Sequence, residues 1–163
     1  MRIDRWLNEL LDKPSYCVDA FPTLEERFNK TNRRRYGMHL EHVYAFNDSN
    51  RELFTDPETK LFDEAVFEQT RNQMGMVLLL KDLQNLSSSN DIYQDKLDDY
   101  AKSDIIWNQL LAGHLPSVDQ KILPEEFRNA AIAPDASGAF PKDKVEQRQR
   151  LFFEAVKTIW SQV

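Results

Sequence analysis

Cysteine and long apolar runs are nearly absent from this chain. The one cysteine, Cys17, cannot build an intrachain disulfide framework or a thiolate cage for zinc. The longest apolar run is too short to cross a bilayer. The first residues, Met-Arg-Ile-Asp-Arg-Trp, alternate charged and apolar side chains and lack the apolar segment of a signal peptide. We therefore expect a cytoplasmic protein and exclude the disulfide-rich secreted and membrane-spanning classes.

Positive charge is also scarce. The chain has 21 Lys and Arg against 27 Asp and Glu, which gives a net charge of −6. A protein that binds nucleic acid by itself usually relies on basic contacts to phosphates, so this balance argues against that class. An acidic metal site, or a partner domain that supplies the basic surface, would weaken the objection. The sequence contains no P-loop, no glycine-rich dinucleotide turn and no serine nucleophile elbow.

The composition is that of a folded globular protein. At 163 residues, with 41% hydrophobic and 11% aromatic residues, the chain is long enough for one domain with a real core, and we predict a single domain over residues 1–163. Helical patterns outnumber strand patterns, so the expected fold class is α+β and predominantly helical. We divide the domain into N-terminal helices at 1–30, a core at 36–101 that contains two strands and a helix, and C-terminal helices at 103–163.

Apolar spacing of three and four residues predicts the helices. Ile3, Trp6, Leu7, Leu10 and Leu11 place one helix at 3–11, and Lys13-Pro14 ends it. Thr23 and Glu26 have the spacing of a capping box after Pro22. Further helices are predicted near 61–72, at 92–100, from Ser103 as N-cap to Leu111 with Gly113 closing it, near 125–131, and at 142–162.

Two strands are predicted, and the first carries an adjacent carboxylate and imidazole. Side chains alternate from Tyr36 to Phe46, and the apolar run Met76–Leu80 follows Gly75. In a regular strand Glu41 and His42 point to opposite faces. Both can serve one site only if the strand ends, twists or bulges at that point.

The order of strand with Glu-His, loop, strand, asparagine-bearing turn and helix is the one that a ββα metal-nuclease site needs. A histidine that is neutral near its own pKa can take a proton from water, and a hard divalent cation such as Mg²⁺ or Mn²⁺ can stabilise a leaving alkoxide. His42 is the candidate base, Glu41 the candidate carboxylate ligand, and Asn85 or Asn90 the candidate amide ligand. Each of these residues alone is more typical of a surface or a turn.

Basic residues near this pair are candidates for contact with DNA phosphates. Arg33, Arg34 and Arg35 precede Glu41-His42, and guanidinium groups bind phosphate oxygens through two parallel hydrogen bonds. As a bare tripeptide they are more typical of a solvated turn, and their position shortly before Glu41-His42 is what favours contact with phosphate. Lys96, in the helix predicted after the second strand, either contacts phosphate, braces the site or is solvated.

These motifs resemble the HNH (His-Me finger) nucleases, in particular the C-terminal nuclease domain of GmrSD-type, modification-dependent restriction endonucleases. The similarity covers roughly residues 30–163. The matching elements are a hydrophobic-Glu-His-hydrophobic motif, an Asn-x-x-Gly before an aliphatic strand, an asparagine after that strand, and single residues in the later helices: Leu40-Glu41-His42-Val43, Asn72-Gln73-Met74-Gly75, Asn85, Asn90, Tyr93, Lys96, Tyr100, Ser103, Arg148 and Trp160.

The resemblance implies a metal-dependent DNA endonuclease with a ββα-metal core, working in restriction or phage defence. It implies His42 as general base and Asn85 as metal ligand, with Glu41 where the wider class carries an Asp or His ligand. Its substrate would be DNA, including modified DNA, and its partner an upstream nucleotide-hydrolysing domain or subunit.

Two positions depart from the family pattern and keep alternatives open. Ala45 stands where the family has a proline, and Met76 where it has an asparagine that supports the histidine loop. These departures favour a second hypothesis, a catalytically inactive module that binds DNA or a partner protein. A third hypothesis is an all-helical interaction domain, which a structure without a hairpin near 38–46 and 75–80 would support.

Overall fold

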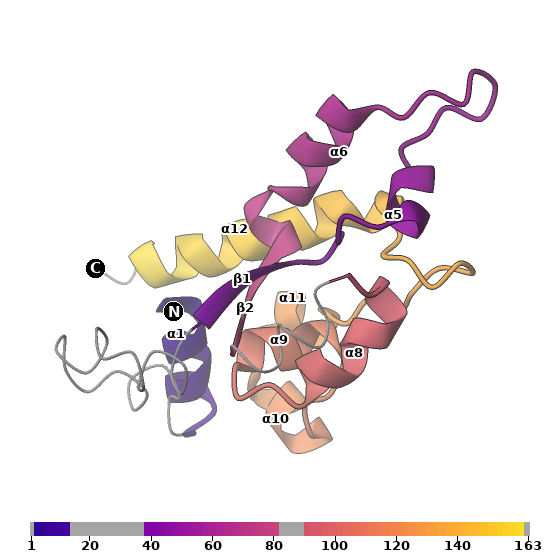
Figure 1. Ribbon diagram of the computed structural model, residues 1–163. Helices are drawn as coiled ribbons and strands as arrows, with labels where there is room; N and C mark the ends of the chain where they lie inside the picture. The colour runs from indigo at the N-terminus through magenta and orange to yellow at the C-terminus, as the bar shows by residue number, and fades with distance from the viewer. Residues whose placement is uncertain (1, 14–37, 82–89, 162–163) are drawn as a thin grey trace, which may run out of the picture.

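The computed structural model describes residues 2–13, 38–81 and 90–161 (Figure 1). The helix predicted after Pro22, the arginines 33–35 and Asn85 lie outside the described residues.

A two-stranded antiparallel hairpin lies at the centre of the described fold. β1 (Met38–His42) pairs with β2 (Val77–Lys81), with Glu41 opposite Leu78 and His42 opposite Val77. Facing residues of an antiparallel pair share a side of the sheet. Glu41 and Leu78 are therefore on the buried side, whereas Leu40 on the other side is 57% exposed. The hairpin confirms the predicted α+β class and rules out the all-helical alternative.

The buried side of the hairpin is covered by α8 (Tyr93–Ala101) and α9 (Ile106–Leu111), both close to their predicted positions. β1, β2 and α8 thus follow one another as the predicted ββα core. The predicted cap of α9 was only partly right. The Ser103 hydroxyl accepts from the Ile105 amide, but the Ile106 amide donates to Asp4 of α1 (Arg2–Leu10) at 2.7 Å. A helix distant in sequence therefore helps to cap α9.

The long helix α12 (Val145–Ser161) lies along the hairpin and contacts the 3₁₀ turn η1 (Met74–Met76) that leads into β2 (Figure 1). A Cβ at Gly75 would lie 2.8 Å from the backbone of Gln149, so only glycine permits this approach. The Gly75 amide donates to the Gln149 side chain at 2.8 Å. η1 and the start of β2 are thereby fixed against α12.

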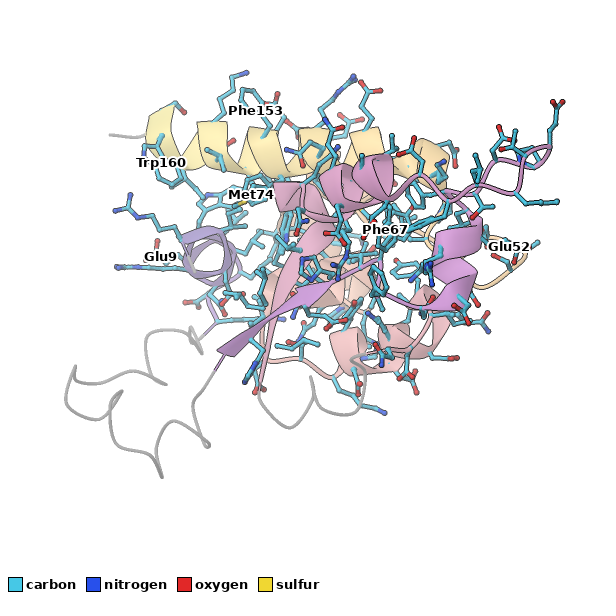
Figure 2. All side chains as sticks on the ribbon, turned by 45° about the horizontal axis from the view of Figure 1, so that its top comes forward. Glu9, Glu52, Phe67, Met74, Phe153 and Trp160 are labelled. Atoms are coloured by element: carbon cyan, nitrogen blue, oxygen red, sulfur yellow. The ribbon has the colours of Figure 1, made fainter. Side chains whose placement is uncertain are left out.

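α10 (Ser117–Ile122) and α11 (Glu125–Arg128) contact each other, and Phe127 of α11 packs against Trp6 of α1. The other elements, α5 (Asp48–Glu52), α6 (Glu64–Arg71) and η2 (Lys142–Lys144), surround an aromatic cluster beside the end of β1. Tyr44 packs edge-on against Phe54 and Phe140. Phe67 of α6, which is labelled in Figure 2, packs against Phe54. None of the described helices is long and apolar enough to span a membrane.

The first strand is shorter than predicted. Alternation in the sequence continues to Phe46, but β1 ends at His42, and the chain turns toward α5. Asn47 caps α5 by accepting from the Asn50 amide at 2.8 Å. Tyr44 lies beyond the strand and is buried by the aromatic cluster. Its agreement with the strand pattern of alternating side chains is therefore a coincidence.

Candidate active site

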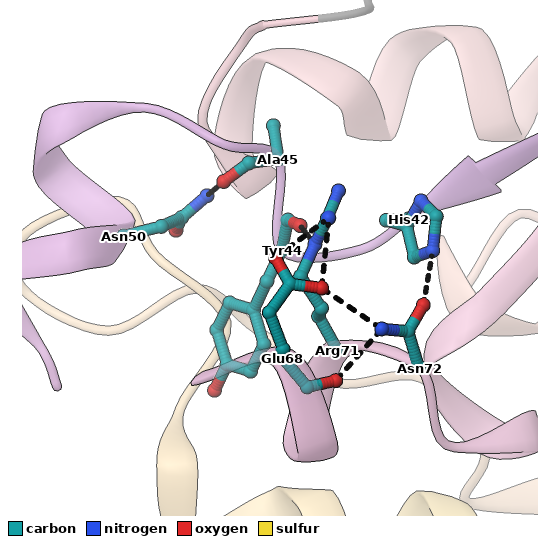
Figure 3. Close-up of polar contacts among 7 residues, drawn as sticks. All are labelled: His42, Tyr44, Ala45, Asn50, Glu68, Arg71 and Asn72. Atoms are coloured by element: carbon teal, nitrogen blue, oxygen red, sulfur yellow. Dashed lines mark hydrogen bonds and ion pairs between the residues drawn. The ribbon is translucent and has the colours of Figure 1, made fainter. Parts of the chain in front are cut away.

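His42 lies where β1 ends, and its ring is tied to the last turn of α6 (Figure 3). Its Nε2 lies 3.0 Å from Oδ1 of Asn72, the residue that closes α6. The Asn72 amide nitrogen donates to the Glu68 carbonyl at 2.8 Å and to a Glu68 carboxylate oxygen at 3.0 Å. One nitrogen of the imidazole is thus held by a short relay on the helix.

The surroundings of His42 favour its neutral form. Partial burial and the nearby Arg71 guanidinium lower the pKa of His42 below 6.5, and the hydrogen bond to Asn72 and the Glu68 carboxylate oppose that shift. The lowered pKa leaves the imidazole neutral at pH 7. A neutral imidazole is the form that can accept a proton.

Glu41 lies on the opposite side of the strand, in the protein interior. Its carboxylate forms an ion pair with the ammonium of Lys96, which is fully buried, and Glu41 itself is 4% exposed. Burial raises the pKa of Glu41 and lowers the pKa of Lys96, while the charge of each partner opposes the shift of the other. The two groups neutralise each other within the core.

This burial corrects two predictions. Lys96 has no surface through which it could contact a DNA phosphate, because its ammonium donates to Glu41 and, at 2.8 Å, to the His42 carbonyl. The Glu41 carboxylate is engaged by Lys96 and faces away from the histidine ring, so the structure does not support it as a metal ligand beside His42. Both side chains position the site instead.

The site thus combines the order β1, β2, α8 with a neutral histidine where β1 ends. The family model described as "GmrSD restriction endonucleases, C-terminal domain" matches residues 6–155. This chain belongs to that family. Membership in this family implies a nuclease of the restriction endonuclease type. No curated protein and no solved structure matches the chain.

Within this GmrSD C-terminal domain, three side chains hold the carbonyls that follow the histidine. Lys96 donates to the His42 carbonyl at 2.8 Å. Arg71 donates to the Tyr44 carbonyl at 3.2 Å, and Asn50 donates to the Ala45 carbonyl at 2.9 Å (Figure 3). The Val43 amide donates to the Met76 carbonyl at 2.9 Å. The loop is therefore anchored although Ala45 and Met76 replace the proline and asparagine of the family pattern.

The described residues do not bring the candidate metal ligands together. Over residues 2–13, 38–81 and 90–161 no group of three or more His, Cys, Asp or Glu could hold a metal ion. Asn90 is exposed, and its carbonyl accepts from the Asn47 side chain at 2.9 Å. The described residues by themselves do not form a fitting donor set, and Asn85 lies outside them.

Sequence reasoning overlooked Glu68 and Arg71 and treated Asn72 only as part of a family motif. All three lie on one face of α6, at positions i, i+3 and i+4, where side chains meet in a helix. Arg71 also donates to Glu68 at 3.2 Å. A polar triad at the end of a helix just before the second strand was the available signal.

Proposed function

We propose that this domain is a metal-dependent DNA endonuclease of HNH type, acting in restriction or phage defence. The observation that carries the proposal is the neutral imidazole of His42, which lies at the end of β1 in a ββα core and is held through one nitrogen by Asn72. Membership in the restriction endonuclease family supports DNA as the substrate.

In the proposed reaction His42 takes a proton from a water molecule as the water oxygen bonds to phosphorus. The bond from phosphorus to the leaving sugar oxygen breaks, and that oxygen acquires a proton from solvent. The lowered pKa of His42 leaves it able to accept the proton at neutral pH. The anchored carbonyls of residues 42, 44 and 45 keep the imidazole in place during this step.

Mg²⁺ or Mn²⁺ is the proposed cofactor, with Asn85 and Asn90 as the amide candidates to hold it. Such a cation would supply charge stabilisation for the leaving oxygen. Arg33, Arg34 and Arg35 are the proposed phosphate contacts. Because the chain carries a net charge of −6, we propose that a nucleotide-hydrolysing partner domain or subunit adds to the DNA-binding surface.

A plasmid-nicking assay with Mg²⁺ or Mn²⁺ tests the proposal. We expect nicking by the wild type and by His114→Ala, a variant of an exposed histidine at the end of α9, and loss of nicking in His42→Ala and Asn85→Ala. Loss of a general base costs on the order of 10²- to 10⁴-fold in rate. Undiminished nicking by His42→Ala would contradict the proposal. Absence of nicking by every protein, with the partner subunit supplied, would favour the catalytically inactive module.

A further inference from the structure

The hydrogen bonds of Asn72 determine which of its side-chain atoms faces His42. An asparagine amide nitrogen carries two hydrogens, and here both have acceptors, the Glu68 carbonyl and the Glu68 carboxylate. The atom that lies 3.0 Å from His42 is then the carbonyl oxygen Oδ1, which can only accept. Reversing the amide would place its oxygen against the two Glu68 oxygens and leave it without a donor there. The network therefore fixes the orientation of the amide.

Because Oδ1 only accepts, Nε2 of His42 must carry the proton. In a neutral imidazole one ring nitrogen donates and the other accepts, so the free lone pair lies on Nδ1, on the side of the ring away from Asn72 (Figure 3). Glu68 acts on His42 indirectly, because its carbonyl and carboxylate oxygens hold the Asn72 amide in place. Arg71 in turn donates to the Glu68 carboxylate at 3.2 Å and keeps that group beside Asn72.

We propose that Asn72 and Glu68 are positioning residues, which hold His42 as the Nε2–H tautomer so that Nδ1 is the nitrogen that takes the proton from water. This inference rests on the proposed endonuclease function. It adds which nitrogen reacts and which residues select it. The rigid support is the last turn of α6, where Glu68 and Asn72 are one helical turn apart.

The direct test is the ¹⁵N NMR spectrum of the imidazole nitrogens, whose chemical shifts separate protonated from unprotonated nitrogen. The chain has 3 histidines, so His42→Ala assigns the signals of His42. For the wild type above the pKa of His42 we expect protonated Nε2 and unprotonated Nδ1. For Asn72→Ala we expect both signals to move toward intermediate values, because the two tautomers exchange once the acceptor is lost.

The kinetic test separates positioning from folding. We expect Asn72→Ala to lower the turnover of nicking by roughly 10- to 100-fold with little change in KM, by analogy with metal-binding histidines that lose their hydrogen-bond partner. The double variant Glu68→Gln/Asn72→Asp exchanges donor and acceptor between the two side chains and conserves their total charge. It restores an acceptor for Nε2 but leaves the Glu68 carbonyl without its donor, and the nearer carboxylate raises the pKa of His42. Above that raised pKa we expect it to recover the tautomer signals of the wild type and part of the turnover lost in Asn72→Ala.

Asn129→Ala is the matched control, because Asn129 also closes a helix, α11, but lies outside the site. Its turnover and imidazole spectrum should equal those of the wild type. A wild-type spectrum with unprotonated Nε2, or unchanged signals and turnover in Asn72→Ala, would overturn the inference. A spectrum that responds to Asn72→Ala in a protein that never cleaves DNA would support the tautomer assignment and overturn the endonuclease proposal, so the two failures are distinguishable.

Discussion

Glu41 and His42 are neighbours in the sequence, yet they belong to two different regions of the molecule. On the interior side of β1, Glu41 and the fully buried Lys96 neutralise each other beside apolar residues. On the outer side, His42 joins a relay with Asn72 and Glu68 at the end of a helix. The period of two in a strand places one residue in the interior, where it contributes to stability, and the next on the outer side, where we propose the chemistry.

The difference shows how a buried ion pair can serve an exposed site. Two charges in the interior are costly unless each is paired and hydrogen-bonded. Lys96 is paired with Glu41, and it uses a further hydrogen on the His42 carbonyl at 2.8 Å. The interior pair thus holds the backbone from which the imidazole extends. The two sides of the strand are coupled through this one carbonyl.

The largest expected effect comes from breaking the interior pair. Lys96→Met leaves the Glu41 carboxylate buried without its cation, and we expect a loss of about 3–5 kcal/mol in the free energy of unfolding. Urea denaturation followed by circular dichroism measures it. Lys102→Met, at the exposed end of the same helix, should change the unfolding free energy by less than about 0.5 kcal/mol.

A double variant separates the contribution of the Glu41–Lys96 ion pair from the other contributions of Lys96. Glu41→Leu/Lys96→Met removes both buried charges, so we expect it to recover most of the stability lost in Lys96→Met. Its nicking activity should stay low, because the His42 carbonyl still lacks its donor. Equal destabilisation of the single and double variants would show that Lys96 contributes through packing or the carbonyl rather than through Glu41.

Much of the secondary structure followed from local pattern. The apolar spacing in 3–11 and 92–100 correctly predicted α1 and α8, and the apolar run before Lys81 correctly predicted β2. The pattern in 142–162 predicted the helix α12 but did not define its buried face. The buried residues of α12 are Val145, Arg148, Leu151 and Ala155. Close packing of Gly75 against this helix and the stacking of the Arg148 guanidinium on Trp107 select that face, and neither is visible in the periodicity.

The candidate site was predicted only in part, because some of its contacts also depend on the tertiary fold. His42 was recognisable from its motif, although its role as the base stays a prediction. The burial of Lys96 had a signal, because it lies three residues after Tyr93 and four before Tyr100, which are both fully buried. A lysine on such a face is more safely interpreted as a buried partner than as a phosphate contact. Its pairing with Glu41 needs the tertiary fold, which brings α8 against β1.

A smaller effect is expected from the donor that holds the far end of the histidine loop. Asn50 is fully buried and donates to the Ala45 carbonyl at 2.9 Å. Asn50→Ala leaves that carbonyl unsatisfied, and we expect about 1–3 kcal/mol of destabilisation with lowered nicking at an unchanged KM. Ser49→Ala, at an exposed neighbour in α5, is the control and should leave both measurements unchanged. If Asn50→Ala retained full turnover, this end of the loop would not position the imidazole.

The smallest expected effect is a shift in the pH dependence of nicking, measured at saturating metal ion. The base acts in its neutral form, so the rate rises with pH, reaches half of its maximum at the pKa of His42 and levels off above it. That pKa lies below 6.5 because burial, Arg71 and Lys96 outweigh Asn72 and Glu68. In the wild type the midpoint of the rise should therefore lie below pH 6.5.

Two variants of α6 should move this midpoint in opposite directions. Arg71→Gln removes a positive charge that lowers the pKa of His42, so its midpoint should rise and its rate at pH 6 should fall further below its own plateau. Glu68→Gln removes a negative charge that raises the pKa, so its midpoint should fall, while the glutamine oxygen can still accept from Asn72. The plateau of Arg71→Gln should also be lower, because the Tyr44 carbonyl loses its donor. Midpoints that move the same way, or do not move, would mean that the group titrating in the rate is not the imidazole beside α6, and the outer side of β1 would lose its assignment to chemistry.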